Sequence, residues 1–143
     1  DGCYATFGPG VPVGGELWNW PFRGVIAEDY VSTRWFEKRF RELTGVKISG
    51  LKDMVGLYEQ GKFCREAEQV FREFSTAFGE IMLPFMQRFE ADSLVIGGGM
   101  VQAAQYFLPQ IRQYFENNHV RASVDIFTDT TLAIITGAAA LCD

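Results

Sequence analysis

Three consecutive glycines, Gly97 to Gly99, follow an apolar run that we interpret as a buried strand, Ser93 to Ile96. Residues 101–117 are expected to form a helix directly after them. A strand that ends in glycines and turns into a helix presents backbone N–H groups to a ligand, because glycine has no Cβ. Open α/β sheets bind ligands at this edge. The glycines therefore indicate a nucleotide contact, and the alternative is a tight turn that contacts no ligand.

A second group of chemically capable side chains lies in a predicted loop near the start of the chain. This loop combines a carboxylate (Glu16), an amide (Asn19) and two indoles (Trp18 and Trp20) within five positions. Gly14 and Gly15 precede it directly. The functional interpretation is a ligand contact, and the alternative is an ordinary exposed loop whose indoles pack in the core.

The composition restricts the classes of function. The 143 residues suit one domain, and 48% hydrophobic with 15% aromatic residues predicts a well-filled core. The net charge of −5 and the absence of a Lys/Arg cluster argue against a nucleic-acid partner. No apolar run is long enough to span a bilayer and no signal peptide is visible, so we expect a cytoplasmic protein without a membrane partner.

The cysteines and the histidine offer too few ligands for a structural zinc site. Cys3, Cys64 and Cys142 are far apart and odd in number, which predicts free thiols in a reducing compartment. His119 is the one histidine. We therefore predict no bound metal in this chain.

The elements that must position these residues follow from periodicity and breaker residues. Pro84 should kink or interrupt the longest helix, whose apolar stripe of mainly aromatic residues we assign to the core. The sequence predicts strands at 3–7, 11–13, 93–96 and 122–127, and helices at 27–43, 51–58, 63–89, 101–117 and 131–141, the last with an N-cap within 128–130. This order predicts a single α/β lobe over 1–143. Because the chain starts at Asp1 as though partway through a strand or turn, we expect a piece of a longer protein.

Three stretches, in this order, resemble the C-terminal lobe of ROK-type sugar kinases and related glucokinases, in the actin-like ATPase superfamily. Residues 15–19 followed by 27–32 are similar to the paired sugar-binding segments of that family. Residues 94–99 look like its adenosine motif, and residues 136–141 look like its last helix. The resemblance extends along nearly the whole chain. Each glycine or alanine motif is loose, and the ordered set is much more specific.

The resemblance implies a ribonuclease H-like, actin-like ATPase fold and a two-lobe parent that transfers the γ-phosphoryl of ATP to a hexose hydroxyl. Mg²⁺ would bridge the phosphates, and a homodimer is expected. Glu16, Asn19 and Glu28 would bind the sugar, because carboxylates accept hydrogen bonds from hydroxyls. Gly97, Gly98 and Gly99 would contact the nucleotide. For Glu28 the alternative is a residue that only favours the start of the helix at 27–43.

Two departures from the family pattern bear on these expectations. Asn19 stands where the family usually has His, which preserves a sugar contact but removes a metal ligand. Pro21 to Ile26 is too short to hold the family's cysteine-rich zinc segment and contains no Cys, so no structural zinc is expected. A catalytic Asp and a phosphate-binding loop are not identifiable and are expected in an N-terminal lobe.

This chain alone is therefore expected to be inactive. The main alternative is the sugar-sensing lobe of a ROK-type transcriptional regulator, and a third is a purely structural domain. The resemblance names neither the hexose nor the phosphoryl donor.

Overall fold

The computed structural model describes residues 11–128 as a mixed α/β fold, a small hairpin followed by helices and a parallel strand pair. The elements, in chain order, are β1 (Pro21–Phe22), β2 (Val25–Ile26), η1 (Ala27–Asp29), α1 (Thr33–Thr44), α2 (Leu51–Glu59), α3 (Cys64–Arg88), β3 (Ser93–Ile96), η2 (Gly99–Ala103), α4 (Ala104–Asn117) and β4 (Ser123–Ile126). The strand expected at 3–7 and the helix expected at 131–141 lie outside the described residues.

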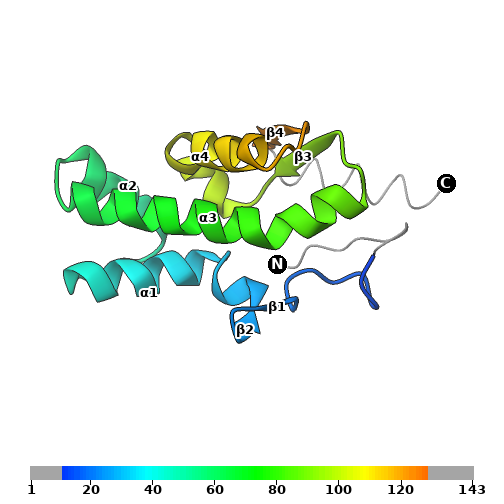
Figure 1. Ribbon diagram of the computed structural model, residues 1–143. Coiled ribbons are helices and arrows are strands. Elements are labelled where there is room, and N and C mark those ends of the chain that lie inside the picture. The colour runs from blue at the N-terminus through cyan, green and yellow to red at the C-terminus, as the bar shows by residue number, and fades with distance from the viewer. Residues whose placement is uncertain (1–10, 129–143) are drawn as a thin grey trace.

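Helix α3 is the centre of the described part and packs against α1, α2 and α4. In Figure 1 it runs between α1 on one side and α4 on the other. Its predicted stripe is largely buried and joins one hydrophobic cluster with α1 and α4, which confirms its assignment to the core. The helix continues through Pro84, so of the two expected effects, a kink or an interruption, the interruption does not occur. Figure 1 shows the last turns of α3 inclined to the preceding axis, as expected for a kink.

The close approach of α3 and α4 depends on one glycine. A Cβ built on Gly79 would lie 2.4 Å from Cδ1 and 2.6 Å from Cγ of Tyr114. The Tyr114 ring thus occupies the space that any side chain at this position would need. Burial also raises the pKa of the Tyr114 hydroxyl.

Strands β3 and β4 pair in parallel, with Ser93 opposite Ser123 and Ile96 opposite Ile126, and α4 connects them as in a βαβ unit. This confirms the predicted strand, helix and strand order. The expectation that β3 is fully buried is wrong for Val95, which is 56% exposed. Leu94 and Ile96 share the face that packs against the core, while Val95 points to the opposite face.

The N-terminal part departs further from the sequence prediction. Residues 11–13 do not form a strand, because the Gly15 N–H donates to the Pro12 carbonyl across a turn (2.9 Å). The hairpin lies instead at β1 and β2, where Arg23 (φ 48°) and Gly24 (φ 82°) provide the two positive φ angles of a tight hairpin turn.

The helix expected from residue 27 to residue 43 is divided. The 3₁₀ turn η1 comes first, Ser32 is extended (φ −118°, ψ 160°), and α1 begins at Thr33. The end of α1 agrees with the prediction, because Gly45 takes a left-handed φ of 73° and its N–H donates to the Arg41 carbonyl (2.8 Å). None of the described helices is long and apolar enough to cross a bilayer.

Candidate functional site

The predicted sugar-binding loop is a compact turn between Gly14 and Trp20. Gly14 (φ 88°) and Gly15 (φ 71°) both take conformations that favour glycine and lead the chain into Glu16. The Asn19 side-chain amide donates to Glu16 Oε2 (2.9 Å). The structure therefore brings Glu16 and Asn19 together, and the Asn19 amide is hydrogen-bonded to the Glu16 carboxylate.

The second predicted segment lies directly beside this loop. The Glu28 N–H donates to the Trp18 carbonyl (2.9 Å), and the Ala27 N–H donates to the Trp20 carbonyl (2.8 Å). These two bonds hold the η1 turn against the loop, although the partners are ten and seven positions apart in sequence. The backbones of the Glu16–Asn19 loop and of Glu28 are thus adjacent.

Glu28 does not open α1, contrary to the sequence interpretation, because it lies in η1 before the extended residue Ser32. Its carboxylate forms an exposed ion pair with Arg34 (Nη2 to Oε1, 3.4 Å). The neighbouring Asp29 carboxylate accepts a hydrogen bond from the Ile26 N–H (3.2 Å) and stabilises the turn. The η1 turn, and not the helix, therefore positions Glu28.

The loop is attached to the protein core through Trp20. Its indole meets the Phe85 ring edge-on at 5.1 Å between centroids, and the Arg88 guanidinium lies 5.9 Å from the indole centroid. Phe85 is fully buried on α3. Trp20 is therefore a packing residue, while Trp18 is half-buried and contributes its carbonyl to the Glu28 contact.

The glycine run follows β3 as predicted. Gly97 comes directly after the strand, Gly98 has a φ of 89° and a ψ of −172°, and Gly99 begins η2. Among residues 11–128, a Cβ on Gly99 would meet no atom within 4 Å, and one on Gly97 would meet only the Phe127 carbonyl oxygen at 4.0 Å. Within this part of the chain, the strand edge at Gly97 and Gly99 is thus open to a neighbouring group.

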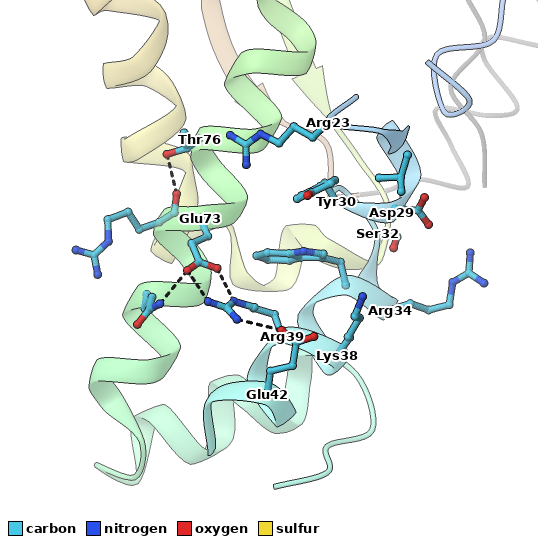
Figure 2. Close-up of a pocket in the computed structure, with 14 residues that line it drawn as sticks. Arg23, Asp29, Tyr30, Ser32, Arg34, Lys38, Arg39, Glu42, Glu73 and Thr76 are labelled. Carbon is cyan, nitrogen blue, oxygen red and sulfur yellow. Dashed lines mark hydrogen bonds and ion pairs between the residues drawn. The ribbon is translucent and has the colours of Figure 1, made fainter. Parts of the chain in front are cut away.

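Figure 2 shows a groove that the sequence did not indicate, between the β1–β2 hairpin, α1 and α3. Its volume is about 1100 Å³. One wall is the ion pair of Arg39 on α1 with Glu73 on α3, at 2.7 Å from Nε to Oε2. No local pattern signals this pair, because 34 residues separate its members.

Within residues 11–128, His, Cys, Asp and Glu side chains do not gather in groups of three or more that could hold a metal ion. Cys64 is a half-buried free thiol whose Sγ lies 3.7 Å from the Tyr58 carbonyl oxygen. Cys3 and Cys142 lie outside the described residues, so the absence of a bound metal stays a prediction.

Known proteins resemble this chain in structure, at low sequence identity. Neither a protein-family model nor a curated protein matches the sequence. Similar solved structures include a presumed sugar kinase from Cytophaga hutchinsonii, with a TM-score of 0.64, 17% identity, and coverage of 78% of this chain and 42% of that chain.

Two further similar structures carry the name ROK. One is a ROK family transcriptional regulator, a homologue of the E. coli MLC protein, with a TM-score of 0.62, 17% identity, and coverage of 78% of this chain and 34% of that chain. The other is a ROK hexokinase from Thermus thermophilus, with a TM-score of 0.56, 18% identity, and coverage of 87% and 40%. This chain thus spans about two fifths or less of these three proteins, and it shares its fold with part of a presumed sugar kinase, a ROK regulator and a ROK hexokinase.

Proposed function

We propose that this chain is the C-terminal lobe of an ATP-dependent hexose kinase of the ROK type, with the ribonuclease H-like fold of actin-like ATPases. The similarity to a sugar kinase and a hexokinase supports this assignment at the level of fold. The observation that carries it is the pair of backbone hydrogen bonds that places Glu28 beside the Glu16–Asn19 loop. These are the two segments that the resemblance assigns to sugar binding.

In this proposal Glu16 and Glu28 accept hydrogen bonds from hydroxyls of the hexose. A carboxylate offers about four acceptor positions, and Asn19 occupies one of those on Glu16. Asn19 thereby orients the carboxylate, and its amide oxygen is available to a sugar hydroxyl. The Arg34–Glu28 pair is exposed at 78% and 32% of the two side chains, so water competes with it and a sugar hydroxyl can share Glu28.

The nucleotide would lie against Gly97, Gly98 and Gly99, where the open edge at Gly97 and Gly99 leaves room for it. MgATP is the second substrate in this proposal. Its Mg²⁺ would need hard oxygen ligands, and the described residues gather no such cluster. We assign the metal-contacting groups and the catalytic Asp to the other lobe of the kinase. We extend the proposal to a cytoplasmic homodimer.

A sugar-sensing lobe of a ROK-type transcriptional regulator is the second candidate. The similarity to the ROK regulator is as strong as that to the kinases, and the proposed sugar contacts serve both functions. The rest of the polypeptide discriminates between the two. A catalytic Asp with a phosphate-binding loop would favour the kinase, and a helix-turn-helix domain would favour the regulator.

Calorimetric titration with a panel of hexoses tests the sugar site. Glu16→Gln and Glu28→Gln should each weaken binding about 5- to 150-fold, since losing a charge-assisted acceptor costs roughly 1–3 kcal/mol. Glu116→Gln, an exposed acid on α4, is the matched control and should bind like the wild type. Wild-type affinity in both site variants, with unchanged circular dichroism, would reject the assignment.

A further inference from the structure

The β1–β2 hairpin directly connects the two segments that the proposed function assigns to sugar binding. Trp20, at the end of the Glu16–Asn19 loop, immediately precedes β1, and Ala27, at the start of η1, immediately follows β2. The Ala27 N–H donates to the Trp20 carbonyl just beyond the paired residues, so this bond continues the ladder of the hairpin. The position of the hairpin therefore determines where the loop and Glu28 lie.

The hairpin is too short to hold this position without help. Its strands have two residues each, and an isolated pair of strands is at best marginally stable in water. Both residues of its turn, Arg23 and Gly24, are exposed. Contacts with other elements must therefore fix the hairpin.

Helix α3 provides two such contacts. At the base of the hairpin, the Trp20 indole meets the Phe85 ring edge-on at 5.1 Å between centroids. At the turn, Arg23 Nη2 donates to Glu80 Oε2 (2.8 Å). Phe85 and Glu80 are five positions apart on α3, which corresponds to roughly 7.5 Å along the helix axis. The hairpin is thus attached to α3 at its base and at its turn.

Arg23 also contacts the residue that ends the η1 turn. Its guanidinium lies 4.9 Å from the Phe22 ring centroid and 5.6 Å from that of Tyr30, which follows η1. These two rings meet edge-on at 5.1 Å between centroids, and a cation near an aromatic ring is attracted by its negative face. Figure 2 shows the Arg23 side chain extended from the hairpin toward α3. One side chain therefore joins the hairpin, the end of the η1 turn and α3.

We propose that Arg23 is a positioning residue for the sugar site, and that its ion pair with Glu80 keeps Glu28 beside the Glu16–Asn19 loop. That these two segments bind a sugar rests on the proposed function, whereas their position relative to each other does not. The ion pair is exposed, at 46% and 37% of the two side chains, and an exposed pair alone is weak. The two ring contacts add to it on the same short element. Because the core around α3 does not depend on the hairpin turn, the effect of losing Arg23 should be local.

Hydrogen exchange of the ¹⁵N-labelled chain, followed by NMR, tests this role without any sugar. The Ala27 and Glu28 N–H groups donate to the carbonyls of Trp20 and Trp18. Their exchange rates therefore report how often the two segments separate. The amides in the middle of α3 report the stability of the core in the same experiment.

Arg23→Gln should speed the exchange of the Ala27 and Glu28 amides about tenfold, because the ion pair and both ring contacts are lost. Glu80→Gln should speed it about threefold, because the ring contacts of Arg23 remain. Arg23→Lys keeps the charge and should recover most of the protection. Asp125→Asn is the matched control, because it breaks another exposed ion pair, with Arg112 (3.3 Å), and should change neither amide.

Addition of a hexose separates this inference from the proposed sugar site. At about ten times its dissociation constant, a hexose that contacts both segments should slow the exchange of the two amides in Arg23→Gln about tenfold. If exchange responds to the variants and to no hexose of a panel, the positioning role of Arg23 stands and the sugar assignment falls.

Three outcomes would overturn the proposal. The first is wild-type exchange of the Ala27 and Glu28 amides in Arg23→Gln, which would leave the base of the hairpin as its effective attachment. The second is an equal increase for the amides in the middle of α3, which would show a general loss of stability. The third is the same exchange in Arg23→Lys as in Arg23→Gln, which would show that the charge at this position does not hold the hairpin.

Discussion

Gly79→Ala offers a direct test of how α3 and α4 pack. The added methyl carbon would lie 2.4–2.8 Å from three ring carbons of Tyr114, well inside van der Waals contact. Overpacking of this kind typically costs about 1–3 kcal/mol. Alanine in a helix interior gains back about 1 kcal/mol relative to glycine. We therefore expect a net destabilisation of about 1 kcal/mol, with an upper value near 2 kcal/mol.

Urea denaturation followed by circular dichroism measures this change, provided that the m-values of the variants agree. Gly56→Ala in α2 is the matched control, because a Cβ at Gly56 meets no atom within 4 Å and should stabilise the protein by about 0.5–1 kcal/mol. In a Tyr114→Ala background, Gly79→Ala should also become stabilising. If Gly79→Ala stabilises the protein with Tyr114 intact, the close packing of the two helices is wrong.

Three further predictions concern acid stability, a helix end and the nucleotide edge. The lowered pKa of Glu73 contributes stability that is present above its unfolded pKa of about 4.3 and is lost as the pH falls through the folded value. Glu73→Gln should therefore flatten the decline in stability below about pH 5, and a wild-type slope in urea titrations would contradict this. Gly45→Ala should lower the melting temperature by about 4 °C, because alanine in the left-handed conformation costs about 1 kcal/mol. An unchanged melting temperature would contradict the left-handed φ of 73° at this position. Gly99→Ala should weaken binding of an ATP analogue without destabilising the protein, since its Cβ meets no atom of the described residues within 4 Å; unchanged nucleotide affinity would leave the glycines as turn residues.

The elements that the sequence predicted well are those with long, regular periodicity. The apolar stripe of α3 extends over about seven turns of helix. So long a stripe at helical spacing is hard to bury in any other secondary structure. The βαβ order around the glycines was also predictable, because β3, α4 and β4 each have a clear composition. The two-residue strands β1 and β2 were missed, since they are too short to show a period and depend on the Arg23–Gly24 turn.

The candidate site was predictable in its residues and not in its arrangement. The break between η1 and α1 arises from contacts that have no sequence signature, such as the Asp29 bond to Ile26 and the packing of Tyr30 on Phe22. The same applies to the backbone bonds that place Glu28 beside the Glu16 loop. The groove depends on ion pairs between helices, which a reading of local patterns cannot detect.

The most direct test of the central claim is an NMR titration of the ¹⁵N-labelled chain with a panel of hexoses. The account predicts that at least one hexose shifts the backbone amides of Glu16 and Glu28 and the side-chain amide of Asn19 along one saturable curve. The amides of Gly97 to Gly99 should shift little with sugar and should respond instead to an ATP analogue. If no hexose at millimolar concentration shifts the loop and the η1 turn together, the assignment of a sugar-binding lobe is wrong.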